Sequence, residues 1–315
     1  MRRALLSMAV LWALLALGSA CSQHEVPMSS PQASQPATPT PVPAPPSTPL
    51  PTPTPSRPSL LLSPSPTLQG TAVLLRVTPA PDGPLVAEVA GRRIPLVREG
   101  DEAVGYLPVP LDQTPGVYAV VLLSDGQTAG QAALEVVDGG YPREQLYLPP
   151  SAAGLLQDAA AVQEEARLLA AAHASFTPQR LWRGPWQMPL EGPVSDAFGI
   201  YRSINGGPYS PHTGTDLVAP EGTPVLAPAT GRVVMARRLH LRGLSVVVDH
   251  GAGVVSGYHH LSSLSVQEGQ TVQAGQELGR VGSTGLAGGP HLHWELVVHG
   301  VRVDPMAWLA ALSGA

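Results

Sequence analysis

Two histidines and a glutamate alternate with apolar residues near the C-terminal end of the chain, in the stretch Gly289 to Leu296. This stretch lies between a Gly-rich run and two valines, a pattern typical of a strand entered from a tight loop. Residues two apart on a strand share a face, so we expect His291, His293 and Glu295 to project together. Two imidazoles on one face suit a metal site, in which one ligates the ion and the other reaches water bound to it. A single His-x-His pair is weak support for such a site.

A second pair of candidate ligands, His212 and Asp216, lies upstream in the sequence His-Thr-Gly-Thr-Asp. The spacing places both on one face of either a helix or a strand, and Gly214 with its threonine neighbours favours an extended segment. A neutral imidazole and a carboxylate suit Zn²⁺, which takes N and O ligands at about 2.0–2.2 Å. Taken alone, the pair is better explained as a surface hydrogen bond within a turn. Eight of the ten histidines, however, fall between His212 and His299, a concentration that packing alone seldom produces.

A third group of polar residues, Tyr258-His259-His260, ends a short strand that begins near Val254. Side chains alternate along a strand, so the two histidines should point to opposite faces. Only one of them is therefore expected to share a face with the other candidate ligands. The general interpretation of such a pair is two solvated side chains.

The composition limits the classes of protein to consider. The 315 residues are enough for about two domains, and the net charge of −5 gives no sign of a basic nucleic-acid surface. Thirty-six prolines and thirty-three glycines, with only two phenylalanines, indicate turn-rich β structure plus a disordered tract. With one cysteine, the chain forms no intrachain disulfide, and any metal site must use His, Asp or Glu.

The first 20 residues have the features of a secretory signal peptide. Two arginines precede an apolar run over residues 4–17, and small residues follow as far as Ala20. The next residue, Cys21, completes a sequence similar to the lipobox of bacterial lipoproteins, although Gly18 stands where Leu is commoner. The resemblance implies a membrane anchor through a lipid on Cys21, and Ser22 favours the outer membrane if the cell has one. Cleavage after Ala20 and an uncleaved anchor helix are the alternatives.

Three further segments are expected before the histidine-rich region. Residues 21–58 are dominated by Pro, Thr, Ser and Ala, which predicts a disordered but stiff tether. Short apolar runs separated by turn signals over residues 59–139 predict an immunoglobulin-like β-sandwich, a spacer or binding platform without a catalytic cluster. Residues 140–188 predict a helical connector, with a helix over residues 151–173 and an extended segment after it. The fold class is therefore mainly β.

The histidine motifs occur in an order and spacing that resemble the lysostaphin-type (LytM-like) zinc endopeptidases, which cut peptidoglycan peptides. The matching motifs are HTGTD at 212–216, YHHL at 258–261, GPHLHWEL at 289–296 and VDP at 303–305. The resemblance covers roughly residues 190–310 and implies an antiparallel β-sheet metallopeptidase domain over residues 189–315. Two Gly-Gln turns are also similar to those of lipoyl-type barrels, but no lysine occupies a turn there to carry a cofactor.

The resemblance also implies a role for each motif residue. It assigns His212, Asp216 and His293 as zinc ligands, and His291 and His260 as catalytic residues at the zinc-bound water. His259 fills a variable position and is expected to face away. No second histidine accompanies His24-Glu25, so a glutamate base of the HExxH type is missing and histidine must do this work.

Three other assignments stay open at this stage. We take His291 as the base and His260 as its partner in orientation or oxyanion binding, without grounds to fix that division. Glu295 is either an outer partner of a ligand or a surface carboxylate. Arg202 is expected to face substrate, and residues 201–211 are flexible enough to form a lid.

The sequence therefore favours a lipid-anchored, zinc-dependent endopeptidase of the cell envelope that hydrolyses peptide cross-links in peptidoglycan. All five functional positions are filled, which argues against the main alternative, a non-catalytic envelope protein that binds peptidoglycan or activates another wall hydrolase. A β-sandwich adhesin with an incidental metal domain is a third and weaker interpretation. The bond that is cut is not encoded in a motif.

Overall fold

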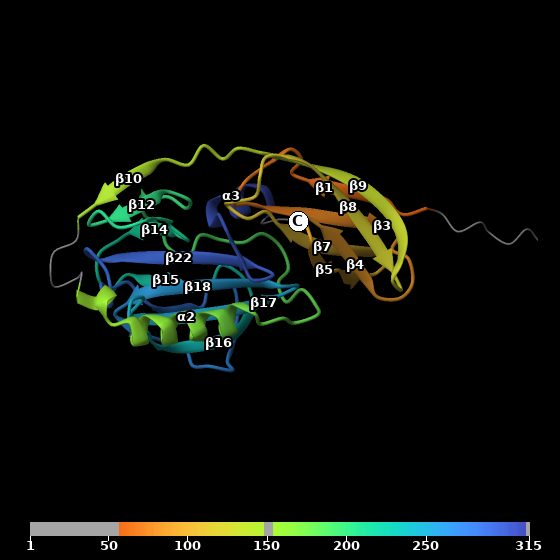
Figure 1. Ribbon diagram of the computed structural model, residues 1–315. Helices are drawn as coiled ribbons and strands as arrows, with labels where there is room; N and C mark the ends of the chain where they lie inside the picture. Colours follow the sequence, from red (N-terminus) through yellow and green to blue (C-terminus); the bar gives the residue numbers. More distant parts are fainter. Residues whose placement is uncertain (1–56, 148–153, 313–315) are drawn as a thin grey trace, which may run out of the picture. The chain divides into compact units, whose positions relative to one another are not determined.

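The structure, a computed structural model, describes residues 57–147 and 154–312 and is mainly β, as predicted (Figure 1). The predicted signal peptide and all of the predicted tether except residues 57 and 58 lie outside the described residues. Among the helices of the described ranges, none combines the length and the apolar character needed to cross a membrane.

The N-terminal described segment folds into two β-sheets. One sheet has the order β1 (Ser59–Ser63), β3 (Ala72–Thr78), β7 (Glu102–Pro108), β6 (Val97–Glu99). The other has the order β2 (Thr67–Leu68), β9 (Gln127–Val137), β8 (Gly116–Ser124), β4 (Leu85–Val89), β5 (Arg92–Pro95). Buried residues from both sheets, such as Val73 and Leu75 from β3 and Leu122 from β8, share one core. The segment is therefore a two-layer sandwich, and alternating inward residues build its core.

The strand β3 is buried on both of its faces. Val73 and Leu75 face the core of the sandwich, whereas Leu74 packs in a second cluster with Tyr106 of β7 and Trp182. Burial on both faces accounts for the continuous apolar run in this strand, which a half-exposed strand would not need. Trp186 and Trp308 complete this aromatic cluster.

The histidine-rich region is built on one large antiparallel sheet. Its strand order is β11 (Val194–Asp196), β14 (Thr215–Val218), β22 (His291–Val298), β18 (Val254–Leu261), β17 (Leu244–Gly251), β16 (Gly231–Arg238), β20 (Thr271–Val272), with β23 (Val301–Val303) also paired to β22. The strands β17, β18 and β22 are buried almost throughout. These central strands hold the candidate site on a rigid support.

Two small sheets accompany the large one. The first has the order β15 (Pro224–Leu226), β21 (Glu277–Arg280), β19 (Ser263–Leu264). The second has the order β10 (Arg143–Leu146), β12 (Tyr201–Ile204), β13 (Tyr209–Pro211), and its β10 runs parallel to β12. The strand β10 lies in the segment for which only a helical connector was predicted, because its short polar sequence has no strand pattern of its own.

Within residues 57–147 and 154–312 there are three helical elements: η1 (Gly154–Gln157), α2 (Ala159–His173) and α3 (Pro305–Leu312). The carboxylate of Asp158 caps α2 by accepting the backbone N–H of Ala161 at 3.0 Å. Leu169 and Ala172 of α2 pack against Val255 and other residues of the large sheet, alongside which α2 lies in Figure 1. The apolar side of the helix therefore packs on the large sheet.

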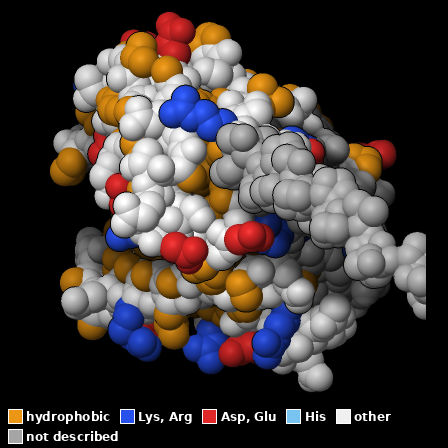
Figure 2. Space-filling view, turned by 90° about the vertical axis from the view of Figure 1, so that its right-hand side faces the viewer, with side chains coloured by type: hydrophobic (Ala, Val, Ile, Leu, Met, Phe, Trp, Pro, Cys, Tyr) orange, Lys and Arg blue, Asp and Glu red, His pale blue; other side chains and the backbone are white. Residues whose placement is uncertain are grey.

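Acidic and basic side chains are interspersed among apolar ones over the face shown in Figure 2. Several ion pairs outside the candidate site are partly or largely exposed, such as Arg76 with Glu102 and Arg167 with Glu164. Exposed pairs of this kind contribute little to stability, so the fold depends chiefly on its apolar clusters.

Candidate metal centre

Strand pairing brings the two candidate ligand motifs together. In the antiparallel pair of β14 and β22, Asp216 lies directly opposite His293. Directly opposed side chains on one face of an antiparallel pair have Cβ atoms about 4.5–5.5 Å apart, so these two must meet. His212 precedes β14 and reaches the same point from the loop before it. The geometry thus joins the HxxxD and HxH motifs at one place.

The donor atoms of His212, Asp216 and His293 converge. His212 Nε2 lies 3.1 Å from His293 Nδ1 and 3.2 Å from Asp216 Oδ1. His293 Nδ1 and Asp216 Oδ1 are 2.7 Å apart. In the described ranges, this is the one group of three or more His, Cys, Asp or Glu residues that could hold a metal ion. Its potential ligand atoms all lie within 4.8 Å of one another. Two imidazole nitrogens and one carboxylate oxygen are a donor set that fits Zn²⁺.

The other nitrogen of each of these imidazoles is held by an outer contact. His212 Nδ1–H donates to the carbonyl oxygen of Ala197 at 2.9 Å, which leaves the Nε2 lone pair facing the ligand group. His293 Nε2 lies 3.2 Å from Glu295 Oε1, on the opposite side of the ring from Nδ1. Such outer contacts fix the tautomer and the orientation of metal-binding histidines.

Glu295 is completely buried, which excludes the interpretation as a surface carboxylate. Its Oε1 accepts hydrogen bonds from Thr213 Oγ1 at 2.9 Å and from Arg242 Nη2. Arg302 Nε lies 3.5 Å from Oε2. Burial by itself would raise the pKa of the Glu295 carboxyl, but the guanidinium groups of Arg242 and Arg302 hold that pKa well below its usual range. Glu295 is therefore an ionised carboxylate at the base of the site.

The Asp216 carboxyl is ionised for a related reason. Burial opposes ionisation, yet the hydrogen bonds to His212 and His293 outweigh it and lower the pKa of Asp216. The same contact with Asp216, together with Glu295, raises the pKa of His293 against the effect of burial. The group is thus an ionised carboxylate flanked by two imidazoles, and the negative charge of Asp216 favours a bound cation.

His260 and His291, the two predicted catalytic residues, lie side by side with ring centroids 4.9 Å apart. His260 Nδ1–H donates to the carbonyl of Thr284 at 2.8 Å, and His291 Nδ1–H donates to the carbonyl of Gly289 at 2.8 Å. In its neutral form each ring therefore has its lone pair on Nε2. His291 Nε2 lies 3.8 Å from Asp216 Oδ2, next to the ligand group. Burial lowers the pKa of His260 to about 3, so this imidazole is neutral near pH 7.

The expectation that His259 faces away is wrong. The register of β18 and β22 places His259 opposite His293, and the ring centroids of the two are 5.7 Å apart. His260 has a φ of 62°, and the pairing of β17 and β18 shifts register at this point, so alternation breaks between the two histidines. Both histidines therefore lie near His293, with His259 buried below the site, where its Nδ1 is 2.8 Å from Ser245 Oγ.

Arg202 does not present a free guanidinium to substrate. It donates to Asp196, and its Nε donates to Glu144 of β10 at 2.6 Å. The segment 201–211, predicted to be a flexible lid, holds the paired strands β12 and β13, and β10 adds a third strand to them. The sequence did not predict the pairing of β10 with β12, because the paired residues, such as Arg143 and Tyr201, are 58 positions apart in the chain.

Sequence reasoning missed several residues around the site. Arg242 and Thr213 both contact Glu295, and Glu165 of α2 contacts Arg242. Thr213 lies inside the HxxxD motif, and its position there was the one available signal. Arg242 and Glu165 stand in no motif, because their importance arises from contacts between segments 77 residues apart.

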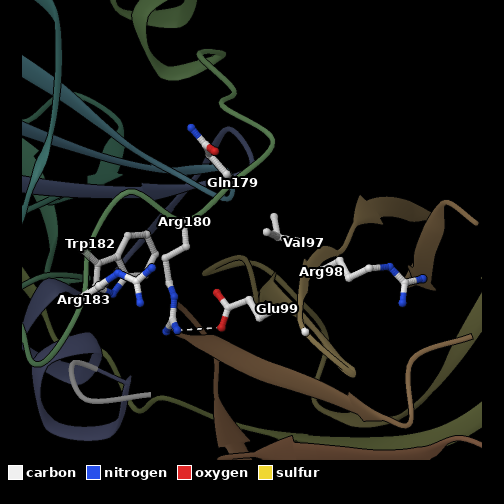
Figure 3. Close-up of a pocket in the computed structure, with 8 residues that line it drawn as sticks. Val97, Arg98, Glu99, Gln179, Arg180, Trp182 and Arg183 are labelled. Carbon is white, nitrogen blue, oxygen red and sulfur yellow. Dashed lines mark hydrogen bonds and ion pairs between the residues drawn. The ribbon is translucent and has the colours of Figure 1, made fainter. Parts of the chain in front are cut away.

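A separate cavity of about 350 Å³ lies beside the sandwich (Figure 3). Its walls include Arg98, Glu99, Arg180 and Trp182, and Arg180 Nη2 donates to Glu99 Oε2 at 2.7 Å. None of its lining residues belongs to the candidate metal centre.

Comparisons with known proteins support an assignment of the histidine-rich region. Residues 210–305 match the model of peptidase family M23. A peptidoglycan DD-endopeptidase of Vibrio cholerae, ShyA, is 46% identical over 97 residues, which are 31% of this chain and 23% of that protein. The cell division protein DipM of Caulobacter vibrioides is 35% identical over 149 residues, 47% of this chain and 22% of that protein. The chain thus spans less than a quarter of the length of these two relatives.

A solved structure extends the similarity beyond the matched region. The crystal structure of a Pseudomonas aeruginosa protein described as a candidate peptidase M23 aligns with a TM-score of 0.61 and 28% identity. The alignment covers 78% of this chain and 95% of that one. Because 78% of the chain exceeds the histidine-rich region, the likeness includes upstream structure.

Proposed function

We propose, from the premise that residues 210–305 form a domain of peptidase family M23, that the chain is a zinc-dependent endopeptidase hydrolysing peptide cross-links of bacterial peptidoglycan. The named activity of the ShyA relative supports the substrate class. The observation that carries the proposal is the convergence of His212, Asp216 and His293, with His260 and His291 beside them.

The three converging residues would hold zinc. Zinc in such a site supplies Lewis acidity, which lowers the pKa of water to about 7 and polarises the scissile carbonyl. In its neutral form His291 would present the Nε2 lone pair next to the ligand group, so it would accept the proton of the attacking water. His260, fixed by the Thr284 carbonyl, would orient that water or stabilise the oxyanion.

The proposal extends to the layout of the whole chain. It assigns 1–20 as a signal peptide, 21–58 as a tether, 59–139 as a sandwich domain, 140–188 as a connector and 189–315 as the peptidase domain, with a lipid on Cys21. A lipid anchor followed by a long stiff tether suits a domain that works on the wall at some distance from its membrane. The proposed location is accordingly the cell envelope.

The decisive experiment uses the full chain and purified peptidoglycan. Cleavage should stop with a chelator and return with zinc, and mass spectrometry of the fragments would identify the bond. A chain that binds zinc but cleaves neither whole peptidoglycan nor its isolated cross-linked peptides would contradict the proposal and favour the non-catalytic alternative.

A further inference from the structure

The helix α2 presents ionisable side chains, as well as apolar ones, to the rest of the protein. Glu165 is 4% exposed and His173, the last residue of the helix, is 6% exposed. Glutamate is seldom buried to this degree unless it is paired. The helix lies outside the region matched to the peptidase family, residues 210–305. Its buried acid therefore calls for an explanation within this chain.

Glu165 binds the loop that connects β16 and β17. Its Oε2 accepts the backbone N–H of Leu241 at 2.5 Å, and Arg242 Nη1 donates to its Oε1 at 3.4 Å. One carboxylate thus holds both the backbone of this loop and the guanidinium that extends from it. Removal of Glu165 would therefore leave the buried Arg242 guanidinium with one carboxylate partner fewer.

Arg242 links Glu165 to the candidate metal centre. Its Nη2 donates to Glu295 Oε1, the same oxygen that lies 3.2 Å from His293 Nε2. Its backbone carbonyl accepts the N–H of His260 at 2.8 Å. A single residue therefore touches the outer partner of one proposed ligand and the backbone of one proposed catalytic residue.

We propose that Glu165 is a positioning residue for the metal centre, acting through Arg242 and Glu295 on the orientation of His293. The inference rests on the proposed function and deepens it, because it makes the upstream helix part of the metal-binding unit. The carboxylate of Glu165 fixes the direction of the guanidinium, which fixes Glu295, which in turn holds the ring of His293 with Nδ1 toward His212 and Asp216.

The test compares Glu165→Gln with Glu164→Gln in the full chain. Glu164 immediately precedes Glu165 in α2, but it is exposed and pairs with Arg167, so its variant is a matched control. Zinc affinity is measured by competition with a chromogenic chelator, with folding checked by circular dichroism. Loss of an outer-sphere partner lowers metal affinity about 10–100-fold, and Glu165 lies further out, so we expect a loss of about 3–10-fold for Glu165→Gln. The control should bind zinc as the unaltered chain does.

A double-mutant cycle separates positioning from a general loss of stability. If Glu165 acts through Arg242, Glu165→Gln should cause no further loss of zinc affinity in an Arg242→Met background. Additive losses, or a lowered melting temperature with zinc affinity equal to the control, would overturn the proposal. Should Glu165→Gln fail to fold, the Arg242→Lys variant tests the proposal instead. Lysine keeps the positive charge but lacks the planar guanidinium. A folded Arg242→Lys variant with unchanged zinc affinity would also overturn the proposal.

The outcomes also distinguish this inference from the proposed function. If the unaltered chain binds zinc but does not cleave peptidoglycan, the proposed function is contradicted. The zinc affinities of the two glutamate variants then still decide the positioning role. Normal cleavage with identical zinc affinities in both glutamate variants contradicts the positioning role alone. An unaltered chain that binds no zinc contradicts both.

Discussion

Gly214 lies against the imidazole of His293. A Cβ atom at Gly214 would come within 2.8 Å of Cε1 and 2.9 Å of Nε2 of His293, and within 2.6 Å of the carbonyl oxygen of Trp294. Contacts below 3.0 Å are essentially never made by real Cβ atoms, and a backbone oxygen on a central strand has little room to move. The glycine between His212 and Asp216 is thus required by the space around His293.

We therefore expect Gly214→Ala to displace His293 and weaken zinc binding by on the order of 10-fold or more. The measurement is zinc affinity by chelator competition. Gly154→Ala is a suitable control, because a Cβ at Gly154 meets no atom of the described residues within 4 Å apart from its chain neighbours. Equal zinc affinities in the two alanine variants would show that the centre tolerates the clash.

Alanine substitutions at the two histidines of the HxH motif should have different effects. His293→Ala removes a proposed ligand, so the purified protein should contain little zinc. His291→Ala should retain zinc but lose peptidoglycan cleavage by about 10²–10⁴-fold, the usual contribution of a general base. Zinc per chain by mass spectrometry and release of wall fragments check both. Retained cleavage in His291→Ala would assign the base to another residue.

Metal removal should lower thermal stability in the unaltered chain. A ligand that binds only the folded state adds about 2.7 kcal/mol when its free concentration is 100 times its Kd. Chelation should thus lower the melting temperature, and added zinc should restore it. The His212→Ala variant should show a much smaller shift, and an equal shift there would mean that the stabilising metal binds elsewhere.

The buried His250 predicts a loss of stability in acid. Burial lowers its pKa to about 4, while its Nδ1–H donates to the Thr230 carbonyl at 3.0 Å and Nε2 lies 2.7 Å from Ser256 Oγ. The unfolded chain, with a His pKa near 6.5, binds a proton that the folded chain excludes, so stability falls as pH drops from about 6.5 to 4.

We expect this single group to contribute about 3 kcal/mol to the loss of unfolding free energy between pH 7 and pH 4. Denaturant unfolding at several pH values would measure that loss. A His250→Gln variant should be less stable at pH 7 but show a shallower dependence on pH. An unchanged slope would place the responsible groups elsewhere, for instance at His299, whose pKa burial also lowers to about 4.

Local patterns in the sequence predicted the parts of the site that depend on strand periodicity. The alternation of β22 correctly placed His293 and Glu295 on one face, as their 3.2 Å contact requires. The same rule failed at His259, because the left-handed backbone of His260 interrupts the alternation and a sequence gives no direct sign of such a bulge.

Long-range contacts could not be predicted in the same way. The parallel pairing of β10 with β12 joins residues 58 apart, such as Arg143 and Tyr201, and β10 has no strand signature. The Glu165–Arg242 contact joins two residues that on their own resemble ordinary surface charges. Such contacts depend on the folded arrangement of distant segments, so a local sequence pattern does not predict them. The apolar runs of the sandwich, in contrast, each predict a strand from local sequence.

Because Asp216 pairs with His293 across two strands, the proposed metal centre forms only when β14 and β22 pair in the correct register. If β14 slipped by one residue along β22, Leu217 would face His293 and the carboxylate would turn to the opposite side of the sheet. A misaligned chain would then be unable to gather its three donors. If the proposed zinc site is correct, zinc present during folding would stabilise only the aligned register, and misaligned copies would bind no metal.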